Sequence, residues 1–117
     1  MPILPTLEAG LLRRDIMKVY IAGPYKKGDV ACNVHDAVVA AERVLSRGHI
    51  PYIPHLTHFW HMMYPHEIKF WYDYDLQWLS CCDCLLRIPG ESRGADNEVN
   101  FALEHGIAVY YSLDDLP

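Results

Sequence analysis

Short apolar runs alternate with longer segments of helical periodicity along most of this chain. The apolar runs predict four β-strands, at residues 18–22, 49–53, 84–88 and 107–111. Between them, apolar residues recur three or four positions apart, which predicts helices over residues 31–47, 66–80 and 95–106. Strands that alternate with helices are typical of an α/β fold, in which helices cover both faces of a parallel sheet.

We therefore expect a single-domain, flavodoxin/Rossmann-like parallel sheet of four to five strands with the order 2-1-3-4. Pro51 and Pro54 favour an edge position for the second strand, because proline cannot donate the hydrogen bonds of a central strand. Residues 1–17 do not continue the pattern, so we expect an N-terminal extension before an α/β domain over residues 18–117. A short helix over residues 6–14 that packs on the domain or on a partner chain is the alternative.

The loops that follow the first three strands should meet at one end of the sheet. Sites in open α/β sheets lie beyond the carboxyl ends of the strands, which here are Ala22, Ile53 and Ile88. Residues 55–65 are rich in aromatic and histidine side chains and predict a long loop that forms a binding wall.

Glu98 is the first candidate for chemistry. The predicted helix over residues 95–106 has one apolar face, formed by Ala95, Val99, Ala102 and Leu103. Glu98 lies at the edge of this face and in the first turn, where the helix dipole should keep its carboxylate ionised. This position suits a nucleophile or a base, and the alternative is a glutamate that only complements the dipole.

Asp75 is the second candidate. On the wheel of the helix over residues 66–80 it lies at the margin of the apolar face, between Ile68 and Trp71. Burial should raise its pKa, which suits a general acid, although a structural cap or a pair with a buried polar group is the alternative. Two inward carboxylates in one small domain favour acid and nucleophile chemistry at a glycosidic bond.

The composition excludes several classes of function. Of the 117 residues 51% are hydrophobic and 21% are charged, which suits a folded soluble domain. A net charge of −5 without a basic run argues against a nucleic acid polymer as partner, and no apolar stretch is long enough to cross a membrane. No signal peptide is visible, and crowded cysteines suggest reduced thiols and a cytoplasmic location.

The chain carries no recognisable cofactor motif. It lacks the glycine-rich loops that bind dinucleotides or nucleoside triphosphates, so we expect no cofactor. The histidines and cysteines of the second half do not have the spacing of a compact metal site, which argues against a metal; they are His55, His58, His61, His66, Cys81, Cys82 and Cys84.

Three short motifs, in this order and spacing, resemble the nucleoside 2-deoxyribosyltransferase family and the related nucleoside 5'-monophosphate N-glycosidases. They are V-Y-I-A-G-P-Y at the first strand, Y-D-L-Q-W-L-S-C-C-D before the third and S-R-G-A-D-N-E-V around Glu98. The resemblance covers the chain from Lys18 to Tyr111. It implies that Glu98 attacks C1' of the sugar, that Tyr20 hydrogen-bonds this carboxylate and that Asp75 helps to protonate the departing base.

The loop residues adjust this picture. Ser92 stands where the transferases usually carry an aspartate and, with Gly94, resembles the phosphate-holding loop of the monophosphate hydrolases. Arg93, Lys26 and Lys27 could supply positive charge at the same end of the sheet, although Lys26 and Lys27 could also belong to a solvated loop. Substrate contacts are expected from Gly23, Lys26, Lys27, His55, Phe59, Ser92, Arg93 and Gly94.

The sequence therefore predicts an enzyme that cleaves or transfers the N-glycosidic bond of a nucleoside or nucleoside 5'-monophosphate. The alternatives are a non-catalytic nucleotide-binding module of the same fold and a metal hydrolase. The apolar side chains of residues 58–64, together with the resemblance, suggest a homodimer or larger homo-oligomer with the site near the interface.

Overall fold

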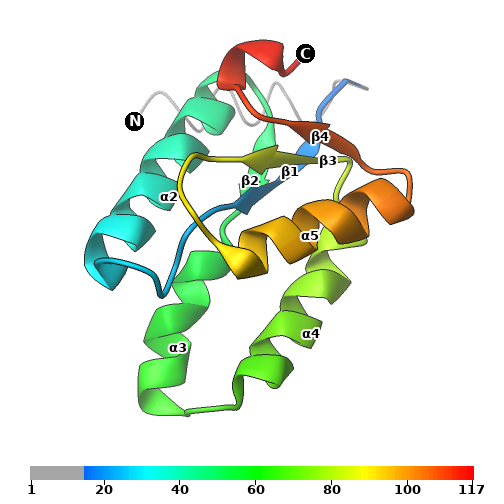
Figure 1. Ribbon diagram of the computed structural model, residues 1–117. Helices are drawn as coiled ribbons and strands as arrows, with labels where there is room; N and C mark the ends of the chain where they lie inside the picture. The colour runs from blue at the N-terminus through cyan, green and yellow to red at the C-terminus, as the bar shows by residue number, and fades with distance from the viewer. Residues whose placement is uncertain (1–14) are drawn as a thin grey trace.

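A computed structural model describes residues 15–117, which form one four-stranded parallel sheet (Figure 1). The strands are β1 (Lys18–Ala22), β2 (Ile50–Tyr52), β3 (Cys84–Arg87) and β4 (Ala108–Tyr110). Their order is β2-β1-β3-β4, and every neighbouring pair is parallel. The predicted α/β fold and strand order are confirmed, with the proline-containing β2 at an edge.

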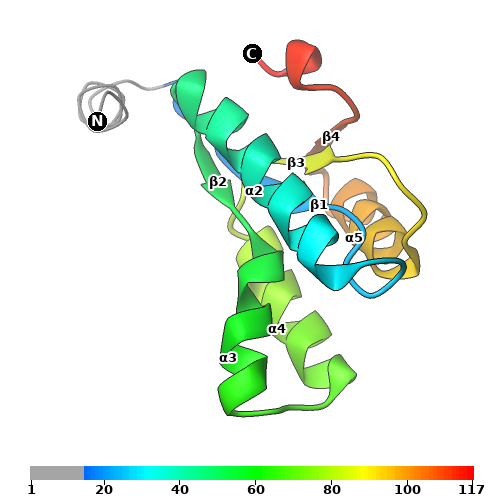
Figure 2. The same ribbon diagram turned by 90° about the vertical axis from the view of Figure 1, so that its left-hand side faces the viewer.

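Helices cover both faces of the sheet (Figures 1 and 2). Helix α2 (Val30–Ser46) packs on one face, where Val19 and Ile21 of β1 point. Helices α4 (Ile68–Leu79) and α5 (Arg93–Glu104) contribute to the core on the other face, where Tyr20 and Ala22 point. The alternation of side chains along one strand thus gives β1 two buried faces. No helix among the described residues is long and apolar enough to span a lipid bilayer.

Helix α5 begins two residues earlier than the sequence pattern predicted. Ser92 is its N-cap, because the Ser92 Oγ accepts a hydrogen bond of 3.1 Å from the backbone N–H of Ala95. Glu98 therefore lies in the second turn, and its predicted place in the first turn is wrong. Leu103, predicted for the apolar face, is 61% exposed, because that face narrows to Ala95, Glu98, Val99 and Ala102.

The predicted loop over residues 55–65 is wrong, because most of it is helical. A 3₁₀ turn, η1 (Pro54–Leu56), leads directly into helix α3 (Thr57–Met63). Pro54 favours this start, since its fixed φ suits the first turn and its missing N–H is not needed there.

Helices α3 and α4 lie side by side and project away from the sheet; residues 54–79 are called the α3–α4 arm below (Figures 1 and 2). Trp60 of α3 meets Trp71 and Tyr74 of α4, with ring centroids 5.3 and 5.8 Å apart. Because the start of α4 extends beyond the core, Ile68 is 68% exposed, contrary to its predicted burial.

The two ends of the described chain pack on the body of the domain. The backbone N–H of Met17 donates to His49 Nδ1 at 3.1 Å, and Leu116 joins the core on the α2 face. Arg47, the residue after α2, donates a hydrogen bond of 3.0 Å to the backbone oxygen of Leu116. Leu116 directly follows the 3₁₀ turn η2 (Leu113–Asp115). The predicted extension lies mostly outside the described residues, as does the alternative helix over residues 6–14.

Candidate active site

A cleft of about 930 Å³ lies between the carboxyl-end loops of the sheet and the α3–α4 arm. It brings together most of the residues predicted for the site from the sequence. These are Gly23, Lys26, Lys27, His55, Asp75, Ser92, Arg93, Gly94 and Glu98. The site therefore lies where ligands bind in open α/β sheets, and the α3–α4 arm supplies its outer wall.

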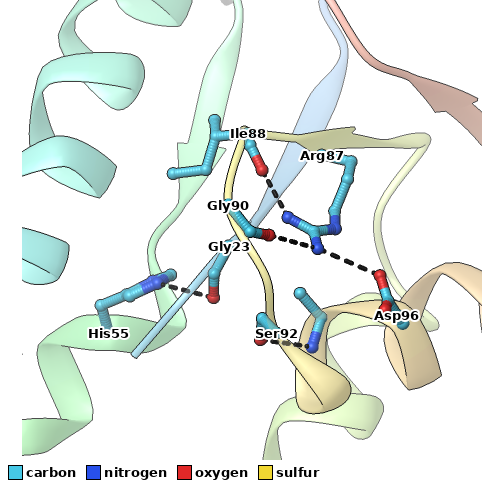
Figure 3. Close-up of polar contacts among 8 residues, drawn as sticks. Gly23, His55, Arg87, Ile88, Gly90, Ser92 and Asp96 are labelled. Carbon is cyan, nitrogen blue, oxygen red and sulfur yellow. Dashed lines mark hydrogen bonds and ion pairs between the residues drawn. The ribbon is translucent and has the colours of Figure 1, made fainter. Parts of the chain in front are cut away.

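The loops after β1, β2 and β3 are locked to one another (Figure 3). A Cβ at Gly23 would overlap the side chain of Ile88, so a larger residue there would force that side chain to move. Gly90 has φ +119°, and a Cβ there would lie 2.5 Å from Pro24 Cγ. His55 Nε2 hydrogen-bonds the backbone oxygens of Gly23 and Pro24 at 3.2 and 3.0 Å, which ties in the loop after β2.

Arg87 braces the loop that leads into α5 (Figure 3). Its guanidinium donates to the backbone oxygens of Ile88 and Gly90 and to Asp96 Oδ1, the last two at 2.8 and 3.0 Å. Asp96 lies in the first turn of α5, so one nearly buried cation connects the end of β3 to the helix that carries Glu98. Arg87 thus ties the floor of the cleft to the start of α5.

Glu98 is buried, with 9% of its surface exposed, and the Tyr20 hydroxyl donates a hydrogen bond to Glu98 Oε2. Burial raises the pKa of Glu98 from 4.5 to about 8. The hydrogen bond from Tyr20 and the charge of Arg87 oppose this rise, and the carboxylate of Asp75 adds to it. The expectation that the helix dipole keeps Glu98 ionised is wrong, because the dipole acts mainly in the first turn and burial dominates here.

Asp75 faces the same cleft from α4, and the Tyr52 hydroxyl donates to its Oδ1 at 3.2 Å. Burial raises the pKa of Asp75 from 3.8 to about 7, and the bond from Tyr52 opposes the rise. This is the direction predicted from its inward position on the helical wheel. Together the two carboxyl groups retain at least one proton near neutral pH.

Two predicted residues do not line the cleft. Tyr20 is fully buried behind it and contacts the site through its hydrogen bond to Glu98. Phe59 is 55% exposed on α3, and its ring lies edge-on against His58 with centroids 5.6 Å apart.

Positive charge gathers at the loop end of the cleft, as predicted, but part of it is already paired. Lys27 Nζ lies 2.6 Å from a carboxylate oxygen of Glu91, which also lines the cleft. Arg93 and Lys26 line the cleft as well. The Ser92 hydroxyl accepts the capping hydrogen bond from Ala95 and can still donate its proton to a ligand.

Several residues of the cleft wall were missed from the sequence. Tyr25, His61, His66, Trp71 and Tyr72 all line it. Trp71 Nε1 donates to His61 Nδ1 at 2.8 Å, so the wall is held by a polar contact as well as by ring packing. The density of aromatic residues between positions 58 and 74 was the available signal, but the assignment of residues 55–65 to a loop hid how that segment packs against the following helix.

The described part of the chain contains no group of three or more His, Cys, Asp or Glu side chains that could hold a metal ion. Burial raises the pKa values of Cys82 and Cys84 to about 11 and about 12, so neither thiol is activated as a nucleophile.

Residues 17–112 match the family described as "Domain of unknown function (DUF7768)". The chain belongs to this family. No curated protein matches this DUF7768 chain. Among solved structures it is similar to a 2-deoxyribosyltransferase from the psychrotolerant bacterium Bacillus psychrosaccharolyticus, with 19% sequence identity and a TM-score of 0.60. The match covers 79% of this chain and 69% of that chain. At this identity the likeness supports a common fold.

Proposed function

We propose that this protein cleaves or transfers the N-glycosidic bond of a nucleoside or nucleoside 5'-monophosphate, with Glu98 as the nucleophile. The observation that supports this most strongly is the pairing of two carboxyl groups in one cleft. Glu98 is held by Tyr20, and Asp75 has a pKa of about 7, which lets it carry a proton near neutral pH. A nucleophile and a proton donor are the two groups that this reaction requires.

In the proposed reaction a carboxylate oxygen of Glu98 forms a bond to C1' as the bond between C1' and the base nitrogen breaks. Asp75 passes its proton to the departing base, so the base leaves neutral. Water, or a second base in a transfer, then attacks C1', releases the Glu98 carboxylate and returns a proton to Asp75. Glu98 Oε2 is the oxygen that Tyr20 holds, which leaves Oε1 for the attack.

The proton must lie on Asp75 and the negative charge on Glu98 for this reaction to proceed. Burial favours the neutral form of Glu98. The positive charge that develops on the sugar would favour the ionised form, and the hydrogen bond from Tyr20 stabilises that form as well. We therefore expect the substrate itself to move the proton balance of the pair towards the reactive state.

A 5'-phosphate is the expected feature of the preferred substrate. Lys26, Lys27 and Arg93 line the loop end of the cleft, and the N-terminus of α5 opens beside them with Ser92 as its cap. Helix N-termini and loop amides bind anions. The ion pair between Lys27 and Glu91 would have to open or to share its cation with the phosphate.

A non-catalytic nucleotide-binding module is the second candidate. It is favoured by one observation: the pKa of about 8 leaves Glu98 largely protonated near neutral pH, and a neutral carboxyl group is a weak nucleophile. Such a module would bind nucleotides tightly but would not release the free base.

Chromatography of reactions with a panel of nucleosides and 5'-monophosphates, with and without an acceptor base, separates these candidates. We expect release or exchange of the base by the wild-type protein and none by Glu98→Gln, since an amide has nearly the same shape but does not attack C1'. Glu104→Gln is the matched control, because Glu104 lies exposed on the same helix. Wild-type turnover in Glu98→Gln, or binding without base release in the wild type, contradicts the enzymatic proposal.

A further inference from the structure

Two tyrosines on neighbouring strands each donate a hydrogen bond to one of the two carboxyl groups. Tyr20 of β1 and Tyr52 of β2 are register partners, and their ring centroids lie 5.5 Å apart. Tyr20 donates to Glu98 of α5, and Tyr52 donates to Asp75 of α4. The edge pair of strands thus ties two helices, and both carboxyl groups, to adjacent points of the sheet.

Tyr52 is held more firmly than a half-exposed tyrosine would be. Its ring stacks on Trp78 of α4, with centroids 5.6 Å apart and an interplanar angle of 20°, while Tyr20 flanks it as well. The hydroxyl of this clamped ring reaches Asp75 Oδ1. Within residues 15–117, Asp75 Oδ2 accepts no hydrogen bond, so that oxygen is left for a ligand in the cleft.

We propose that Tyr52 is a positioning residue for proton transfer: by holding Oδ1 it fixes the rotation of the Asp75 carboxyl group and leaves Oδ2 to carry the proton that passes to the departing base. This inference rests on the proposed function. As the proton leaves Oδ2, Asp75 becomes a carboxylate and the bond from Tyr52 becomes charge-assisted, which strengthens it. The contact therefore stabilises the state that forms as the base departs, more than the state before it.

The groups that surround Asp75 agree with this division of roles. Tyr52 from β2, Tyr20 from β1 and Glu98 from α5 are the titratable groups that interact with it electrostatically. Lys69, the nearest cation along α4 that lines the cleft, is paired with Asp73 at 2.6 Å. The Tyr52 hydroxyl is thus the group that opposes the effect of burial on Asp75.

Tyr52→Phe tests the proposal, because phenylalanine keeps the stacked ring and removes only the hydroxyl. Two purine substrates with the sugar selected by the panel are compared, one with adenine and one with 7-methylguanine. Adenine needs a proton to depart, whereas 7-methylguanine already carries a positive charge in the glycoside. We expect kcat to fall about tenfold for the adenine substrate, with little change in KM, and to change little for the 7-methylguanine substrate. Tyr111→Phe, at an exposed tyrosine after β4, is the control and should leave both rates unchanged.

A second measurement does not depend on turnover. Carbon NMR titration of the side-chain carboxyl groups gives the pKa of Asp75, whose signal is identified by its loss in Asp75→Asn. Tyr52→Phe should raise this pKa further, since the bond from Tyr52 lowers it in the wild-type protein. Adding Tyr52→Phe to Asp75→Asn should not slow the reaction further, because the two groups act as one unit.

Each result decides one question. If no substrate is cleaved by the wild-type protein, the proposed function fails, and the titration alone still tests the contact between Tyr52 and Asp75. An unchanged Asp75 titration in Tyr52→Phe overturns the positioning role. Equal losses of kcat on both substrates, or additive losses in the double variant, overturn it too.

Discussion

Replacing Glu98 with glutamine should stabilise the fold near neutral pH while removing the proposed nucleophile. Burial raises the Glu98 pKa from 4.5 to about 8, so the folded protein retains a proton that the unfolded chain has already released. For an acid whose pKa is raised by folding, the stability is highest below the unfolded pKa. It then falls as the pH rises towards the folded pKa.

The size of the effect follows from this shift in pKa. One pKa unit corresponds to about 1.4 kcal/mol. A rise from 4.5 to about 8 therefore lowers the free energy of unfolding by about 5 kcal/mol at a pH where Glu98 is ionised in both the folded and the unfolded state. Near pH 7 the free energy of unfolding is lowered by about 3 kcal/mol. Glutamine carries no such cost, and its amide oxygen can still accept the hydrogen bond from Tyr20.

Urea unfolding of the wild-type protein and of Glu98→Gln, at about pH 5, pH 7 and pH 8.5, measures the difference. The advantage of the variant should be small near pH 5 and should grow by about 2–3 kcal/mol by pH 7. Asp75 also destabilises the fold as the pH rises, and because its carboxylate interacts with Glu98, its contribution cancels only in part in the difference. Glu104→Gln, at an exposed position of the same helix, is the control. The reasoning is refuted if Glu98→Gln is less stable than the wild type near pH 7, or if their difference does not change with pH.

Three further outcomes are expected. On the Glu98→Gln protein, 5'-monophosphates should bind about 10- to 100-fold more tightly than the matching nucleosides, because a charge-assisted contact contributes about 1.5–3 kcal/mol. Calorimetry measures both dissociation constants; equal constants, or a preference that salt does not weaken, contradict the phosphate site. Gly23→Ala should lower the free energy of unfolding by about 1–3 kcal/mol through overlap with Ile88, whereas Gly94→Ala, with open space around it, should not. Similar unfolding midpoints for the two variants would contradict the close contact between the loops. Sedimentation at micromolar concentration should give a dimer or larger assembly of the wild-type protein. Met63→Glu, at a side chain that is 70% exposed on the α3–α4 arm, should favour the monomer. A monomeric wild type contradicts the predicted assembly.

The sheet was predictable because its strands are strongly apolar and closely bounded. The run that contains Tyr20 and Ile21 is buried on both faces, so its continuous apolar sequence marks it as a strand without knowledge of the neighbouring elements. The inward positions of Glu98 and Asp75 were also visible, since the wheel needs only a correct helical period. Their burial and their distances from other groups depend on packing between elements and could not be read from any one helix.

The α3–α4 arm was not predictable in the same way. The aromatic residues of α3 and of the first part of α4 pack on one another rather than on the sheet, so no stripe of buried positions marks α3. Tyr52 was missed for a different reason. The position of Tyr52 beside Tyr20 depends on the register between β1 and β2, and register between parallel strands is a property of the assembled sheet. The start of α5 was misplaced because the cap at Ser92 was read as part of a loop.

The construction of the α3–α4 arm has a consequence for motion. Helix α3 has no buried residue, and in α4 only Leu79 is buried, at the end nearest the sheet. Segments with so little buried surface open locally at a much lower free energy than the core of a domain. Amide hydrogens of residues 57–72 should therefore exchange with solvent well before those of β1 and β3. One wall of the cleft is then a separate cooperative unit, free to adapt its shape to a ligand while the opposite floor, held by Arg87 and the interlocked glycine loops, stays fixed.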